Sequence, residues 1–104
     1  MRKYTETLGN YAGKKGTKRI GNHTVELWSL LRYTVYLDDA TDKWRRIDNP
    51  TRIFRYHDNP ICIVNDNTKQ FWLSHAGWFT TSTTQAVNSY REYFSGLGYT
   101  CMTE

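Results

Sequence analysis

Apolar and polar positions alternate along residues 24–37. One parity of this run holds Val25, Leu27, Leu31, Tyr33, Val35 and Leu37. A period of two with β-branched and aromatic residues predicts a β-strand. The run is long for one strand, so we expect a bulge or break near Ser29. A helix over residues 23–31 is the alternative, because Glu26, Leu27 and Leu30 also suit a helix.

Four shorter runs follow between polar turns, at residues 44–47, 53–56, 61–64 and 70–73. The run at 61–64 is continuously apolar, which is typical of a central strand. Parallel strands need long crossover connections, so the short spacings here predict an antiparallel meander.

One helical pattern lies near the C-terminus. Residues 80–84 are all Thr or Ser and supply hydroxyls that suit an N-cap. Helical spacing separates the apolar residues that follow, which are Val87, Tyr90, Phe94 and Leu97. Gly96 and Gly98 then end the helix, which we expect at about residues 83–95. The predicted fold is α+β, an antiparallel sheet of about four to five strands with one C-terminal amphipathic helix packed on one face.

The net charge is concentrated at the N-terminus. The whole chain of 104 residues carries +4, and residues 1–19 alone carry +5 from six Lys/Arg against Glu6. This segment also contains three glycines and few aliphatic residues. We therefore expect residues 1–19 to be a basic arm, mobile when unbound, and residues 20–104 to be a single α+β domain.

Composition narrows the class of protein. Two cysteines do not make a disulfide framework, and we expect Cys62 to be a buried residue and Cys101 a free thiol. No apolar run approaches the roughly 20 residues of a membrane span. The N-terminal residues have charge but no apolar core typical of a signal peptide. These features predict a soluble, cytoplasmic protein that does not contact a membrane.

No catalytic or metal-binding motif is visible among the histidines and cysteines. Cys62 and His75 offer a nucleophile and a base across the meander, but a buried Cys and a surface His are the favoured interpretation. The spacings that build a zinc site or a calcium loop are absent. We therefore expect a binding module that is not an enzyme and needs no cofactor.

Nucleic acid is the first predicted partner, because basic residues occur together and arginines lie beside aromatic residues. The arm supplies Lys14, Lys15, Lys18 and Arg19 for phosphates. A second surface is expected around Trp44, Arg46 and Arg55, where bases stack on aromatic rings.

The alternative partner is a protein with an acidic surface, which the arm would attract and exposed aromatics would bind. Trp72 and Trp78 are the expected anchors of this interaction. Trp78 and Phe79 also suit a hydrophobic staple at the start of the helix. A homodimer that binds a small nucleotide is a third possibility.

Residues 55–99 resemble a family of small uncharacterised bacteriophage proteins. The similarity lies in Arg55-Tyr56, in residues 60–63, in Gly77-Trp78-Phe79 with the Thr/Ser run after it, and in the tyrosine-rich helix. The resemblance implies a viral accessory protein in the cytoplasm of a host cell. Such proteins often block host machinery, so it also implies an inhibitor of a host or antiviral-defence factor, for example of CRISPR type.

Overall fold

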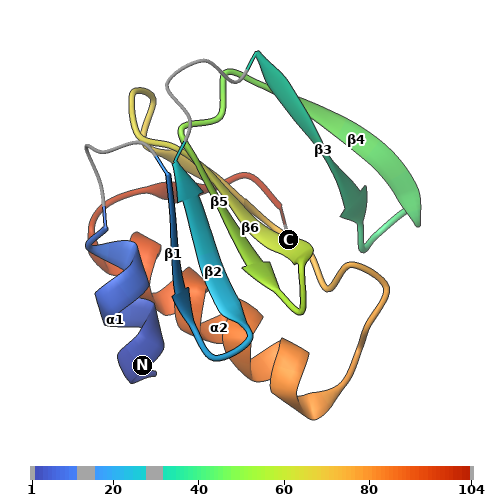
Figure 1. Cartoon of the computed structure of the whole chain (residues 1–104). Helices are drawn as coiled ribbons and strands as arrows, with labels where there is room; N and C mark the ends of the chain where they lie inside the picture. The colour runs from blue at the N-terminus through green and yellow to red at the C-terminus, as the bar shows by residue number, and fades with distance from the viewer. Residues whose placement is uncertain (1, 12–15, 28–31, 104) are drawn as a thin grey trace.

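The computed structural model describes residues 2–11, 16–27 and 32–103, which form two helices and eight strands. In chain order these are α1 (Lys3–Gly9), β1 (Gly16–Ile20), β2 (His23–Leu27), β3 (Tyr33–Asp38), β4 (Lys43–Asp48), β5 (Arg52–Tyr56), β6 (Asn59–Asn65), β7 (Gln70–Leu73), α2 (Thr81–Gly96) and β8 (Thr100–Cys101). Six strands form one sheet in the order β1-β2-β5-β6-β7-β8. Strands β3 and β4 form a separate two-stranded sheet, which we call the ribbon (Figure 1).

The α+β class with a C-terminal helix packed on the sheet is confirmed. The runs at 53–56, 61–64 and 70–73 form β5, β6 and β7 of the predicted antiparallel meander, and α2 covers the expected residues. The run at 44–47 does not join that meander, because β4 pairs with β3 in the ribbon instead. The six-stranded sheet exceeds the expected number because the predicted arm supplies β1 and the chain end supplies β8. Strand β8 is parallel to β7, since α2 forms the crossover between them.

We expected residues 1–19 to be a mobile arm, but the residues that the structure describes there form α1 and most of β1. Helix α1 buries Leu8 completely and bonds α2 through Thr5, whose Oγ1 lies 2.6 Å from Oγ of Ser89. Strand β1 pairs with β2 along its whole length. Lys14 and Lys15 lie outside the described residues.

The alternating run at residues 24–37 divides into β2 and β3, and the expected break near Ser29 lies outside the described residues. The helical alternative is wrong for residues 23–27, which form β2. Val25 and Leu27 are buried, but Tyr33 and Val35 of the same parity are exposed. On β3 the side chain that enters the core is Tyr36. Strand β3 belongs to a different sheet from β2, and its pairing there decides which alternate residues face the core.

Two cores hold three layers together. The larger core joins one face of the six-stranded sheet to the helices, with Phe54, Phe71 and Tyr90 among its buried side chains. The smaller core lies on the opposite face, where Ile53 and Ile63 contact Tyr36 and Ile47 of the ribbon. Neighbouring residues such as Phe54 and Ile53 serve different cores because successive side chains of a strand point to opposite faces.

A buried ion pair fixes the end of α1 against the sheet. The Arg52 side chain is 3% exposed, and its Nε and Nη2 donate to the two carboxylate oxygens of Asp66 at 2.9 and 2.7 Å. Its Nη1 also donates to the carbonyl oxygen of Gly9 at 2.6 Å. Burial opposes ionisation of Asp66, but hydrogen bonds from Arg52, Thr51 and Tyr99 outweigh it and hold its pKa below the usual value.

Candidate binding surface

The outer face of the ribbon carries side chains that the small core does not use. Opposite pairs on this face are Tyr33 with Asp48, Val35 with Arg46, and Leu37 with Trp44. Trp44 is 65% exposed, Tyr33 52% and Val35 43%. The Arg46 guanidinium lies over the Tyr33 ring at 4.2 Å from its centroid, and its Nε donates to Asp48 at 2.8 Å. Cross-strand pairs therefore hold an aromatic and aliphatic face towards solvent.

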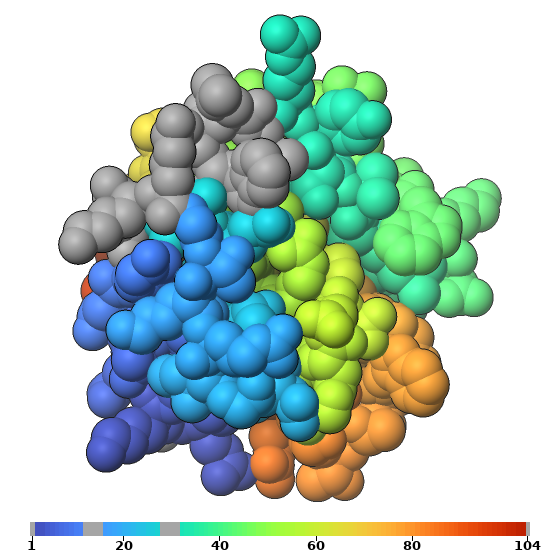
Figure 2. Space-filling model, viewed as in Figure 1, coloured from blue at the N-terminus to red at the C-terminus, as the bar shows by residue number. Residues whose placement is uncertain are grey.

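The loop at residues 74–80, between β7 and α2, extends this surface, and we call it the α2 loop. Its Ser74 hydroxyl donates to the carbonyl oxygen of Leu37, and the backbone N–H of His75 donates to Asp39 at 2.9 Å. Trp78 and Phe79 are 60% and 65% exposed. In Figure 2 the ribbon and the α2 loop lie next to each other along one side of the molecule.

Exposed apolar side chains are concentrated on this side. Of the seven large hydrophobic residues that are exposed in the described part of the chain, five belong to the ribbon or the α2 loop. These five, which we call the aromatic surface, are Tyr33, Val35, Trp44, Trp78 and Phe79. Exposed apolar side chains that gather on one side of a protein mark interaction sites more often than scattered ones do.

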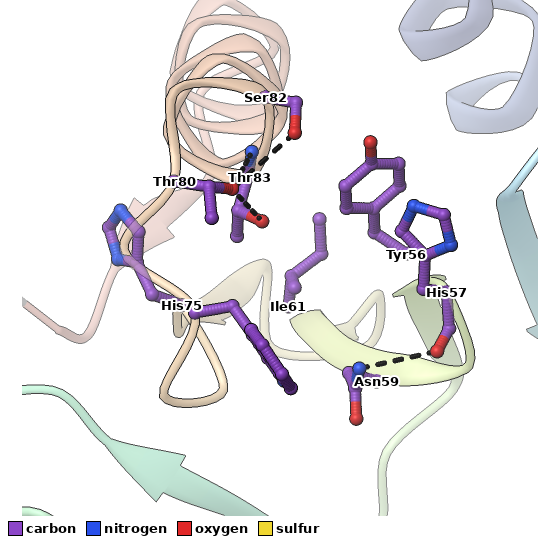
Figure 3. A pocket seen from close by; sticks show the side chains of 9 residues that line it. Tyr56, His57, Asn59, Ile61, His75, Thr80, Ser82 and Thr83 are labelled. Carbon is purple, nitrogen blue, oxygen red and sulfur yellow. Dashed lines mark hydrogen bonds between the residues drawn. The ribbon is translucent and has the colours of Figure 1, made fainter.

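A pocket of about 450 Å³ opens beside Trp78. Its walls come from the β5–β6 hairpin, the α2 loop and the first turn of α2 (Figure 3). Ile61 points towards the start of α2, with His75 and Tyr56 on opposite sides of the pocket. The remaining lining residues are His57, Asn59, Thr80, Ser82 and Thr83. The pocket combines an apolar floor with hydroxyl, amide and imidazole groups, a composition typical of binding sites.

Local sequence explains how the pocket walls are placed. Tyr56 and Asn59 are partners across the hairpin, so only His57 and Asp58 form its turn, with φ values of 50° and 65°. This is the left-handed backbone that tight two-residue hairpins require. On the opposite wall, Thr80 caps α2 by accepting a hydrogen bond from the backbone N–H of Thr83 at 3.2 Å. The expected N-cap within residues 80–84 is thereby confirmed.

His75 connects the pocket to the ribbon. Its Nδ1 lies 2.7 Å from Oδ2 of Asp39, and its Nε2 lies 3.2 Å from Oγ1 of Thr84. These groups follow the order carboxylate, imidazole and hydroxyl, which also occurs in hydroxyl nucleophile sites. Phe79, however, stacks on the imidazole at 4.5 Å, and Thr84 belongs to the first turns of α2. We therefore interpret the three groups as a structural connection.

The other candidate for chemistry, Cys62, is fully buried on β6. Burial raises the pKa of its thiol well above the usual value, so the thiolate that nucleophilic attack needs is disfavoured. Cys62 and Cys101 are both free, as expected. Within residues 2–11, 16–27 and 32–103, no group of three or more His, Cys, Asp or Glu side chains is placed to hold a metal ion.

The predicted nucleic-acid residues are distributed over separate parts of the fold. Trp44 and Arg46 share the outer face of the ribbon. Arg55 instead lies on β5 of the six-stranded sheet, where its Nη1 donates to Glu26 of β2. Lys18 and Arg19 lie on β1, at the edge of that sheet. The expected single surface around Trp44, Arg46 and Arg55 is therefore divided between two sheets.

The two predicted anchor tryptophans have different environments. Trp72 is half-buried and packs against the core between the ribbon and the six-stranded sheet. Trp78 is mostly exposed, as is Phe79, so neither is buried as a hydrophobic staple would be. Sequence reasoning did not select Tyr33 or Val35 as contact residues, because it placed them on the same parity of the alternating run as Val25 and Leu27. It considered Phe79 together with Trp78 as a hydrophobic staple, but named only Trp78 as a binding anchor.

No helix in the described part of the chain is long and apolar enough to cross a membrane. Comparisons of the chain with protein-family models, with curated proteins and with solved structures find no match.

Proposed function

We propose that this protein is a non-enzymatic binding module that docks onto another protein through the aromatic surface. The observation that supports this proposal best is the concentration of five of the seven exposed large hydrophobics of the described residues on one side of the molecule. Tyr, Trp and Arg supply most of the binding energy at protein interfaces. Trp44, Tyr33 and Arg46 bring these three types together on one face of the ribbon.

The charge of the ribbon favours a protein partner over nucleic acid. Residues 32–48 hold four positive and four negative side chains, namely Arg32, Lys43, Arg45, Arg46 and Asp38, Asp39, Asp42, Asp48. Nucleic-acid affinity depends on cations that neutralise phosphates. Here Asp48 lies beside Arg46 and Asp38 beside Arg45, so each of these cations stands next to a carboxylate that would repel a phosphate. A neutral face with exposed rings suits an apolar protein surface better than a polyanion.

The pocket supports the same proposal because it adjoins Trp78. A side chain of the partner can enter between Ile61 and the first turn of α2, while Trp78 covers it from the rim. Interfaces gain affinity where such an anchor is removed from water at the centre of the contact.

The class of partner follows from the resemblance of residues 55–99 to small bacteriophage proteins. Proteins of that kind often block host machinery, so we propose a host protein as the partner, with antiviral-defence factors as the first to test. The molecule would then act in the cytoplasm of an infected cell. Nucleic-acid binding by Lys14, Lys15, Lys18 and Arg19 stays a separate prediction.

A quantitative capture experiment tests the proposal. The immobilised protein is exposed to host lysate treated with nuclease, and retained proteins are compared for Trp44→Ala, Trp78→Ala and Leu97→Ala. Leu97 is an exposed apolar residue outside the aromatic surface and serves as the matched control. We expect the wild type to retain a host protein, and to retain it also in 0.5 M salt. Either Trp variant should lower the retained amount of that protein at least about tenfold, and Leu97→Ala should leave it unchanged.

Labelled single- and double-stranded DNA and RNA, titrated over a salt series, supply the opposing test. Binding that falls steeply with salt and depends on Lys18 and Arg19, with no protein retained through Trp44 and Trp78, would contradict the proposal.

A further inference from the structure

Strand β1 forms one edge of the six-stranded sheet, and no other strand of the described residues lies beyond it. Four of its five residues are exposed, and Ile20 is half-buried. Strand β2 uses the backbone groups on one side of β1. Alternate residues of an antiparallel strand turn their N–H and C=O groups to the other side, where a further strand can pair.

The charge of this edge limits what can pair with it. Strand β1 contains Lys18 and Arg19 and no carboxylate. Antiparallel pairing of two copies along β1 would bring these cations together, and like charges opposite each other destabilise a sheet. Cationic side chains on edge strands also protect proteins against self-association. The edge therefore disfavours a second copy of this chain and favours a strand of opposite charge.

The two cations lie on opposite faces of the sheet. Lys18 Nζ lies 5.5 Å from the centroid of the Tyr11 ring, and Ile20, of the same parity, packs against the core on the helix side. Arg19 faces the other side, where its Nη2 lies 3.4 Å from Oδ1 of Asp58. Both members of that ion pair are largely exposed, so the pair is weak and Arg19 can bind another carboxylate in place of Asp58.

We propose that the β1 edge binds an extended acidic segment of a partner protein, which adds to the sheet as a further strand. Backbone hydrogen bonds to β1 would supply part of the affinity, as in other cases of strand addition. Two consecutive carboxylates in the segment would face opposite sides of the sheet, one towards Lys18 and the other towards Arg19. This site is separate from the aromatic surface and does not depend on the function proposed for it.

The test uses a blocked peptide of about eight residues, the length of an ordinary strand, built from threonine and valine with two adjacent glutamates at its centre. Amide hydrogen exchange and chemical shifts of the full-length protein are followed by NMR during titration. We expect slower exchange at alternate amides of β1, with no change at the ribbon. A peptide with lysines in place of the glutamates should not bind, nor should one with methylated backbone nitrogens.

Variants make the result specific. The double variant Lys18→Glu with Arg19→Glu should lose the glutamate peptide and bind the lysine peptide, and Trp44→Ala should leave both results unchanged. Unchanged β1 exchange at millimolar glutamate peptide would overturn the proposal. Equal binding of the methylated peptide would also overturn it, because contact would then be through side chains alone. Displacement of the peptide by a single-stranded oligonucleotide, without slower β1 exchange, would assign the edge to nucleic acid instead.

Discussion

Nδ1 of His75 lies 2.7 Å from Oδ2 of Asp39, and this contact joins the α2 loop to the turn between the strands of the ribbon. The backbone N–H of His75 donates to the other oxygen of the same carboxylate. Because Nε2 of His75 also meets the Thr84 hydroxyl, one imidazole connects the ribbon, the α2 loop and helix α2. The position of the α2 loop, with Trp78 and Phe79, relative to the ribbon therefore depends in part on this polar contact.

Replacing Asp39 should loosen the α2 loop without disturbing the six-stranded sheet. We expect Asp39→Ala to lower the free energy of unfolding by about 1–3 kcal/mol, since the His75 groups lose their acceptor. Amide exchange should accelerate at Ala76 and Trp78 and stay unchanged in β6. Lys43→Ala, in the same hairpin, is the control. Equal exchange in the wild type and Asp39→Ala would show that the contact does not hold the loop.

The buried pair of Arg52 and Asp66 should be far more sensitive than the exposed pair of Arg46 and Asp48. We expect Arg52→Met to cost about 3–5 kcal/mol in urea unfolding, because Asp66 and the Gly9 carbonyl lose their donor in a largely buried site. Arg46→Met, the matched control, should cost less than about 1 kcal/mol because both partners are exposed. Similar costs for the two variants would refute this account of the α1 contact.

Gly9 is required for the packing of α1 against α2. A Cβ at this position would lie 2.4 Å from Cε2 of Tyr93, whose hydroxyl donates to Asn10 at 2.6 Å and holds the ring in place. We expect Gly9→Ala to lower the free energy of unfolding by about 1–3 kcal/mol. Gly96→Ala has open space around it and should raise stability by about 0.4–1 kcal/mol. Thermal unfolding compares the stability of both variants with that of the wild type. A Gly9→Ala variant as stable as the wild type would contradict the close packing of Gly9 against Tyr93.

Stability should depend on pH through His23, which stacks between Tyr4 and Tyr56. Burial and the nearby His57 lower the pKa of His23 from 6.5 to about 4. The unfolded chain therefore binds a proton between these pH values that the folded chain does not. Stability is full above pH 6.5 and falls as the pH decreases to about 4.

The expected loss is about 1–2 kcal/mol, after allowance for the partial exposure of the ring to solvent. Urea unfolding between pH 4 and 7 measures it. His23→Phe keeps an aromatic ring in the stack and should flatten the profile over this range. An unchanged profile in His23→Phe would assign the dependence to another group.

Local patterns were sufficient for much of the fold. Periodicity predicted the strands from β4 to β7 and helix α2, because each strand is a short run between turn residues and α2 has apolar residues at helical spacing. Helix α1 was missed because its segment has few large apolar residues and is stabilised by tertiary contacts such as Arg52 with Gly9. Propensity alone gives little weight to such a short helix.

The candidate surface was harder to predict than the fold. Trp44 and Trp78 were recognised as possible contacts, but the exposure of Tyr33 and Val35 depends on β3 leaving the six-stranded sheet. The alternation continues in the sequence across residues 28–31, so it gives no sign that the two strands belong to different sheets. The pocket is formed by the β5–β6 hairpin and by the α2 loop with the start of α2, which are separated in the chain by most of β6 and by β7. No local sequence pattern predicts that these segments meet.

Site-specific photo-crosslinking in host cells tests the central proposal most directly. A photoreactive phenylalanine analogue replaces Trp44 in one variant and Leu97 in the other. We expect one discrete protein adduct from position 44, resistant to nuclease, and none from position 97. Identical adducts from both positions, or a nuclease-sensitive adduct from position 44, would contradict a protein-docking role for the aromatic surface.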